Sequence, residues 1–167
     1  MGKPILKVPG LYCLCLLFFL SCQEQQSTET TTSDSNEVHS ISSLKAQLEA
    51  DGFQTFDYVD EKTGDTILMQ QYFIAFLKRG AQTDQDSITL AELQQQHLAH
   101  LGRMYELGYA DISGPFGDDG DIRGITIYNV PTLQMADSLA NADPMVQAGR
   151  LQIEVHPWWA AKGFPLR

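Results

Sequence analysis

The alternation of apolar and polar positions predicts a domain of sheet and helix in the second half of the chain. Residues 71–77 (QYFIAFL) are apolar on both faces of a strand, which is typical of a central strand covered on at least one side. In residues 89–107 the apolar positions recur every three or four residues, which indicates an amphipathic helix that ends before Gly108. Further strands are predicted over 109–113, 125–130 and 151–155, and a further helix over 133–140.

The order of these elements from residue 71 onward is β-α-β-β-α-β. This is the split βαβ order of ferredoxin-like folds, so the predicted fold class is α+β with an antiparallel sheet, over residues 70–167. Residues 44–69 are expected to form a connector. It would begin with a short helix that Ser42 or Ser43 caps and that ends before Gly52, followed by a small hairpin around residues 62–65.

The beginning of the chain has a different pattern. Lys3 and Lys7 precede an apolar run over residues 8–20, which is shorter than the roughly 18–20 residues of a membrane span and is typical of a secretory signal. Residues 23–40 contain Val38 as their only aliphatic residue and no aromatic residue. Such a segment cannot bury enough apolar surface to offset its ordering entropy, so we expect a disordered tether over residues 22–43.

The apolar run ends at Ser21-Cys22, which resembles the lipobox of bacterial lipoproteins. The resemblance implies a signal peptide over residues 1–21, cleavage before Cys22 and lipidation of Cys22, and so a membrane anchor in the bacterial envelope. Gln23 in place of an aspartate favours the outer membrane and periplasm. The alternative is an uncleaved or conventionally cleaved signal. Cys13, Cys15 and Cys22 are the only cysteines, so an exported domain would contain no disulfide.

The charge of the chain excludes one class of function. With 21 acidic against 11 basic residues, the formal net charge is −10, and no cluster of lysine or arginine in the sequence offsets it. Such a chain repels phosphate backbones, so nucleic-acid binding is not expected.

Four stretches resemble the YCII-related domain family, a branch of the dimeric α+β barrel superfamily. They are residues 72–77 (YFIAFL), 96–101 (QHLAHL), 112–115 (ISGP) and 141–149 (NADPMVQAG). The resemblance implies a ferredoxin-like protomer whose sheet packs against that of a second copy in a homodimer. It also implies a pocket between helix and sheet that binds a small molecule. The family's histidine falls on His97, its aspartate on Asp143, and its AGP-like stretch on Ser113, Gly114 and Pro115.

The helical pattern alone also indicates His97 as a candidate functional residue. At about 100° per residue, Leu90, Leu93, His97, Leu101 and Met104 fall within roughly 80° of one another, so the histidine faces the sheet. An aspartate bonded to one ring nitrogen would fix the tautomer and leave the other nitrogen to take a substrate proton. The alternative is a core histidine whose nitrogens bond to backbone carbonyls.

The other candidate residues have structural explanations beside functional ones. Asp143 before Pro144 is a typical helix cap, although its second oxygen would remain for His97. Ser113 would offer a hydroxyl at the pocket, or it would simply end a strand. Trp158 would close the pocket or meet the partner subunit, or it would pack in the core.

Metal binding is not favoured. His97, His100 and His156 would be the available nitrogens, but the helical pitch turns His100 about 60° away from His97. The acidic run over residues 118–121 lacks the ligand alternation of a calcium loop and is interpreted as a hairpin turn.

These observations lead to two hypotheses of different classes. The first is a cofactor-free isomerase or lyase acting on a small organic acid or an aromatic compound. In it, His97 is the base, Asp143 orients it, and the backbone around Ser113 and Gly114 stabilises developing negative charge. The second is a non-catalytic module that binds a small ligand or a protein partner.

Overall fold

The computed structural model describes residues 31–166, with side chains from residue 40 onward. The predicted signal peptide, Cys22 and the first part of the tether lie outside the described residues, and they stay predictions. Within the described part, no helix combines the length and the apolar character that crossing a membrane requires.

Five antiparallel strands form one sheet around a long central strand. They are β1 (Thr55–Val59), β2 (Thr66–Arg79), β3 (Ala110–Pro115), β4 (Ile122–Tyr128) and β5 (Leu151–Ala161). Strand β2 pairs with β5 along one edge, and with β1 and then β4 along the other, while β3 pairs with β4. From β2 onward, the element order confirms the predicted β-α-β-β-α-β arrangement and the α+β fold class with an antiparallel sheet.

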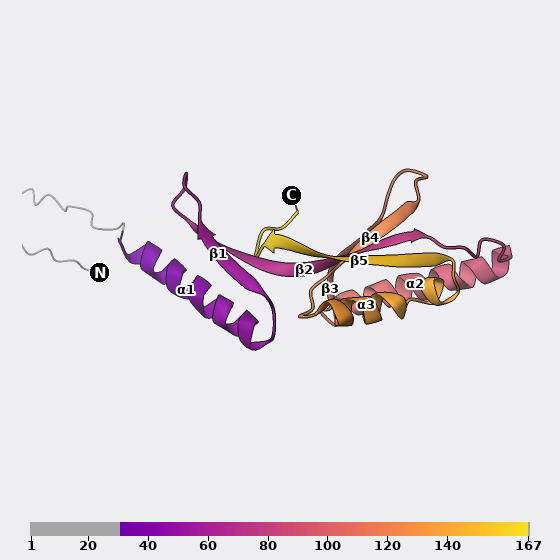
Figure 1. The fold of residues 1–167 in the computed structure, drawn as a ribbon, viewed down its shortest axis with the longest axis horizontal. Coiled ribbons are helices and arrows are strands. Elements are labelled where there is room, and N and C mark those ends of the chain that lie inside the picture. Colours follow the sequence, from indigo (N-terminus) through magenta and orange to yellow (C-terminus); the bar gives the residue numbers. More distant parts are fainter. Residues whose placement is uncertain (1–30, 167) are drawn as a thin grey trace, which may run out of the picture.

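Three helices cover one face of this sheet (Figure 1). They are α2 (Ser87–Glu106), α3 (Leu133–Asn141) and the single turn α4 (Pro144–Gln147). Helix α1 (Thr31–Ala50) lies at the other end of the molecule and contacts β1 and the beginning of β2 (Figure 1). The described chain is therefore elongated, with the N-terminal helix and hairpin at one end and the helix-covered sheet at the other.

The core lies between the sheet and the helices. Phe73 and Ala75 of β2 are buried against Met104 of α2 and Ala136 of α3, together with Tyr128 of β4. Successive side chains of a strand point to opposite faces, so Tyr72, Ile74 and Phe76 lie on the other face, from which α2, α3 and α4 are absent (Figure 1). The sheet therefore has one covered and one largely open face, as antiparallel sheets commonly have.

Helix α1 differs from the expectation. It begins at Thr31 rather than at Ser42 or Ser43, so residues 31–43 of the expected tether are helical. The hydrophobic pattern could not indicate this, because Leu48 is the only residue of α1 with a described side chain that is buried. Once the turn around Leu48 has formed, each residue added toward the N-terminus gains a backbone hydrogen bond at little further cost.

Two strands are longer than predicted. Strand β2 runs without a break from the hairpin with β1 into the domain, so residue 70 is not a structural boundary. Strand β5 continues through Pro157 to Ala161, whereas the prediction ended it at Val155. Pro157 is tolerated because β5 is an edge strand that pairs only with β2, and an edge strand leaves half of its N–H groups without a partner strand.

Two glycines allow the end of β2 and the beginning of β5 to approach closely. The backbone N–H of Gly80 donates to the carbonyl of Arg150 at 2.9 Å. A Cβ on Gly80 would lie 2.1 Å from the carbonyl oxygen of Gly149, and Gly149 itself has a positive φ of 70°. The backbone at this junction therefore requires glycine for both steric and conformational reasons.

Gly80→Ala should destabilise the protein by about 2 kcal/mol, because the added methyl group overlaps backbone that cannot yield without shifting Arg150. Gly102→Ala is the matched control: it lies within α2, where an added Cβ meets nothing within 4 Å, and should stabilise by up to about 1 kcal/mol. Urea unfolding of both variants measures the difference. Equal stability of the two would contradict the close approach.

Candidate functional site

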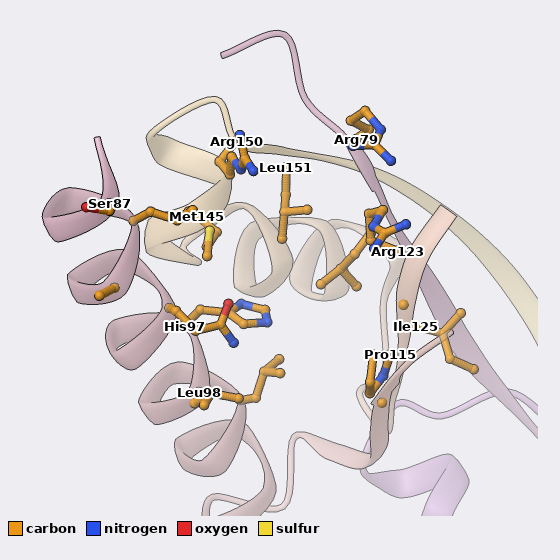
Figure 2. A pocket seen from close by; sticks show the side chains of 17 residues that line it. Arg79, Ser87, His97, Leu98, Pro115, Arg123, Ile125, Met145, Arg150 and Leu151 are labelled. Carbon is orange, nitrogen blue, oxygen red and sulfur yellow. The ribbon is translucent and has the colours of Figure 1, made fainter. Parts of the chain in front are cut away.

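A cavity of about 660 Å³ lies between α2 and the helix-covered face of the sheet (Figure 2). Its lining comes from α2, from strands β2, β3 and β4, from α4 and from the beginning of β5. Much of the wall is apolar and includes Leu90 and Leu101 of α2 and Leu77 of β2. A cavity of this size and character is typical of a small-molecule site.

His97 lines this cavity and forms a hydrogen bond with Asp143, which is buried behind it. The distance between Nδ1 of His97 and Oδ2 of Asp143 is 2.6 Å, and the side chains are 12% and 3% exposed, respectively. Figure 2 shows the imidazole of His97 pointing from α2 into the cavity. The sequence prediction that this histidine faces the sheet, with Asp143 as its partner, therefore agrees with the geometry.

The local fold fixes Asp143 independently of His97. Asp143 is the N-cap of α4, where its Oδ1 accepts from the backbone N–H of Met145 at 2.8 Å and Pro144 takes the first helical position. Capping and the fixed φ of proline both favour a helix start here. One carboxylate oxygen therefore accepts the hydrogen bond of the helix cap, while the other accepts a hydrogen bond from the imidazole.

This arrangement determines the proton positions on His97. An ionised carboxylate can only accept hydrogen bonds, so Nδ1 must donate to Asp143. In the neutral ring, Nε2 then carries the lone pair. A base with that geometry can take a proton from a ligand in the cavity, and Asp143 stabilises the imidazolium that forms.

Tyr128 lies near the pair and stays neutral. Its side chain is buried in the core, and this burial, followed by the negative charge of Asp143, raises the pKa of Tyr128 above its usual range. The phenol therefore adds no second negative charge beside Asp143.

This part of the chain matches a known protein family. The model of the YCII-related domain family matches residues 72–159, which is more than half of the chain and includes Asp143 and every residue that lines the cavity. The chain belongs to the YCII-related domain family.

The fold is also similar to that of a solved structure. The solved structure is 5-chloro-2-hydroxyhydroquinone dehydrochlorinase from Burkholderia phenoliruptrix, in complex with 2,5-dihydroxybenzoquinone. It is 21% identical with a TM-score of 0.40, over 52% of this chain and 92% of that chain. An identity this low says nothing about substrate or activity. No curated protein matches the chain in sequence.

Not every candidate residue from the sequence reaches the cavity. Gly114 and Pro115 line it, but Ser113 and Trp158 do not. The hydroxyl of Ser113 lies 3.0 Å from that of Thr126, and the backbone of Ser113 and Gly114 lies within the β3–β4 ladder. Trp158 alternates with Pro157 along β5, so it lies on the opposite face of the sheet, beside Tyr72.

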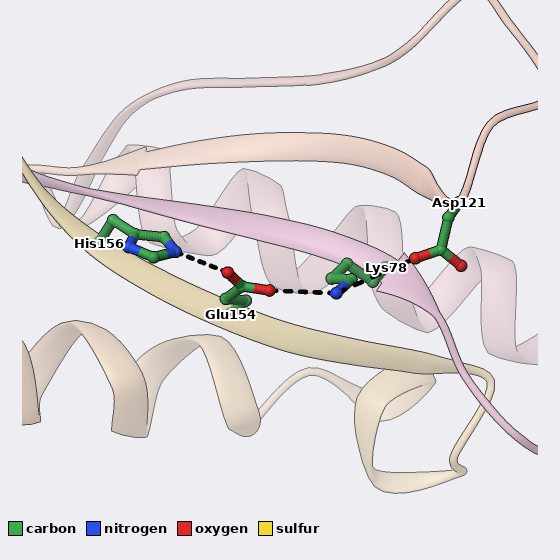
Figure 3. A network of polar contacts seen from close by, with 4 residues as sticks. All are labelled: Lys78, Asp121, Glu154 and His156. Carbon is green, nitrogen blue, oxygen red and sulfur yellow. Dashed lines mark hydrogen bonds and ion pairs between the residues drawn. The ribbon is translucent and has the colours of Figure 1, made fainter.

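The three histidines considered as metal ligands do not come together. Among the described residues, no group of three or more histidine, cysteine or acidic side chains is arranged to hold a metal ion. His156 lies on the open face, where its Nε2 is 2.7 Å from Glu154 (Figure 3). Glu154 in turn accepts from Lys78 at 3.1 Å, and Lys78 also lies 4.0 Å from Asp121. The hydrogen bonds from His156 and then Lys78 lower the pKa of Glu154.

Sequence reasoning missed three residues of the YCII cavity, namely Arg79, Arg123 and Arg150. Each is next to a glycine at or near an end of a strand: Arg79-Gly80 and Gly149-Arg150 at the β2–β5 junction, and Arg123-Gly124 in β4. Arg103 also follows a glycine, Gly102, without lining the cavity, so this pattern alone could not have found them.

Asp143→Asn should change the tautomer of His97. If Oδ1 of the new amide keeps the α4 cap, its NH₂ group faces Nδ1 and forces that nitrogen to accept, so the proton moves to Nε2. Two-dimensional ¹⁵N NMR of the imidazole measures this directly, with protonated Nδ1 expected in the unaltered protein. Asp137→Asn, on the exposed side of α3, is the control. An unchanged tautomer together with unchanged stability would contradict the double role of Asp143.

Proposed function

We propose that this YCII-related domain is a cofactor-free acid–base enzyme of isomerase or lyase type, acting on a small organic acid or an aromatic compound. The observation that supports it is that His97, bonded to the buried Asp143, lines a cavity large enough for such a ligand. The pair has what proton abstraction requires, which is a base aimed at the ligand and a carboxylate that fixes its orientation.

In the proposed reaction, Nε2 of His97 removes a proton from a carbon atom of the ligand. The C–H bond breaks, its electron pair moves into the ligand, and the proton stays on Nε2 beside the ionised Asp143. An isomerase then returns the proton to a different carbon, whereas a lyase uses the electron pair to expel a leaving group. Asp143 only orients and stabilises the imidazolium, and its own proton content does not change.

The alternative function is a non-catalytic module that holds a small ligand in the same cavity. The cavity and its apolar walls serve this function as well, since binding alone does not require a base. The two functions differ in one measurable property, which is the exchange of carbon-bound hydrogen with solvent.

Exchange in D₂O provides the test. A panel of small carboxylic acids and phenols is incubated with the protein, and deuterium incorporation at carbon is followed by NMR. At least one compound should exchange, and His97→Gln should slow that exchange by about 10²- to 10⁴-fold, the usual contribution of a general base.

His156→Gln is the matched control, because His156 lies on the open face of the sheet and not at the cavity. It should leave the exchange unchanged. Exchange that survives His97→Gln would overturn the role of His97, and binding of panel members without any exchange would favour the non-catalytic module.

The homodimer implied by the family resemblance also stays a proposal. The open face of the sheet carries Ile74, Phe76, Ile112 and Trp158, and the last two are 36% and 41% exposed. A second copy that packs its own open face here would bury these apolar side chains, and a two-fold axis would make the contact self-complementary.

Ile112→Lys should therefore weaken the dimer and shift it toward monomer, because it places a charge in a buried apolar contact. Ile88→Lys is the matched control, since Ile88 is 73% exposed at the beginning of α2. Analytical ultracentrifugation measures both variants. A monomeric unaltered protein at micromolar concentration would contradict the proposal.

A further inference from the structure

We infer that Arg79, Arg123 and Arg150 form an anion-binding subsite at one end of the cavity, and that the ligand is a small anion with an apolar body. We call these three residues the arginine subsite. The inference deepens the proposed function by choosing the organic acid over a neutral aromatic compound. It rests on the proposed function for the role of His97 in chemistry, whereas the binding site itself follows from the cavity.

The charge distribution around the cavity is the opposite of that of the whole chain. The chain has a net charge of −10 and five arginines, and three of the five line this one cavity. No aspartate or glutamate is among the lining residues. Gathering like charges in one place has an electrostatic cost, and an anion bound between them would relieve it.

None of the three guanidinium groups is neutralised within the described part of the chain. Every ion pair there is made by a lysine or a histidine, and none by Arg79, Arg123 or Arg150. Arg123 donates through one nitrogen to the carbonyls of Asp118 and Gly120, at 3.3 and 3.1 Å. These bonds hold the side chain in place and leave its other N–H donors for a ligand.

The fold brings the three arginines together from positions far apart in the sequence. Arg79 ends β2 and pairs in register with Leu151, the residue after Arg150. The backbone N–H of Arg79 also donates to the carbonyl of Asp121 at 2.9 Å, which places the beginning of β4 beside it.

An irregularity in the β2–β4 ladder admits Arg123 to the cavity. Leu77 pairs with Gly124 and Lys78 with Ile122, so Arg123 is the extra residue of a bulge. Bulges redirect a side chain from one face of a sheet toward the other. Figure 2 shows Arg79, Arg123 and Arg150 at the same end of the cavity.

The remainder of the cavity selects the rest of the ligand. Away from the arginine subsite most of the wall is apolar, including Leu98, Leu101 and Pro115, and His97 lies between the two regions (Figure 2). A ligand whose anionic group binds the arginines would place its apolar body across the imidazole. Arginine suits this role because its planar fork binds a carboxylate through two parallel hydrogen bonds.

Matched pairs of carboxylates and amides test the inference. Hexanoate, benzoate and phenylacetate are compared with hexanamide, benzamide and phenylacetamide by calorimetry and ligand-observed NMR. At least one carboxylate should bind about tenfold or more tightly than its amide. Arg79→Gln and Arg150→Gln should each weaken that carboxylate by about tenfold, as expected for the loss of a charge-assisted hydrogen bond, and should leave the amide unchanged.

Arg103→Gln is the control for charge alone, because Arg103 lies in the last turn of α2 and does not line the cavity. It should leave carboxylate binding unchanged, and thermal unfolding confirms that every variant is folded. The inference is overturned if no carboxylate is preferred over its amide, or if Arg103→Gln weakens binding as much as Arg150→Gln does.

His97→Gln separates this inference from the proposed function. It should slow hydrogen exchange by the factor given above but preserve the preference for carboxylate over amide. If the preference is found and no compound exchanges, the arginine subsite stands and the enzymatic proposal fails. If exchange occurs equally in acids and amides, the enzymatic proposal stands and the arginine subsite is overturned.

Discussion

The structure of the site depends on a single carboxylate that satisfies two partners at once. Asp143 is almost fully buried, and a buried charge is tolerated only where each oxygen has a hydrogen-bond donor. Met145 supplies a backbone donor and His97 supplies an imidazole donor, from a different helix. The same contact therefore starts α4, joins it to α2 and orients the base. Asp143 therefore contributes both to the start of α4 and to the orientation of His97. A substitution of Asp143 would affect both at once.

The two ends of the cavity are organised by different physical effects. At one end, main-chain hydrogen bonds and a bulge bring the backbones of β2, β4 and β5 together, and this brings the three arginines to one place. Toward the other, the side chains of α2 pack toward the sheet and leave an apolar wall. His97 lies where the two regions meet. Such a division suits a ligand with one anionic and one apolar part. The anionic part would contact the arginines, and the apolar part would contact the apolar wall.

The sequence predicted the elements whose periodicity is strong. Residues 71–77 are a short run that is apolar on both faces, and the apolar positions of α2 recur every three or four residues. The central strand and the helix that carries His97 therefore follow from the pattern alone. The end of β5 could not be predicted from the pattern. Proline interrupts a strand unless the strand lies at the edge of its sheet, and the local sequence around Pro157 does not say which strands lie at an edge. The helical start of α1 was missed for a similar reason, since its first turns carry no apolar pattern.

Some residues of the site could likewise be predicted from the sequence, and others could not. His97 was found from its place on an apolar stripe, and Asp143 from its cap and from the family resemblance. The arginines were missed because only the register of β2 with β4 and β5 brings Arg79, Arg123 and Arg150 to one place. Of the alternatives for Trp158, closing the pocket is wrong, because β5 continues past Val155 and its alternation places Trp158 on the opposite face of the sheet.

The continuity of β2 has a mechanical consequence. Its 14 residues span roughly 40 Å, at about 3.3 Å per residue less the effect of twist, with the β1 hairpin at one end and Arg79 at the other. A single extended segment of this kind resists bending, because its neighbours on both edges are bonded to it over most of its length. The strand therefore works as a spacer. Whatever holds the N-terminal helix and hairpin also sets the distance and the direction at which the mouth of the cavity is presented.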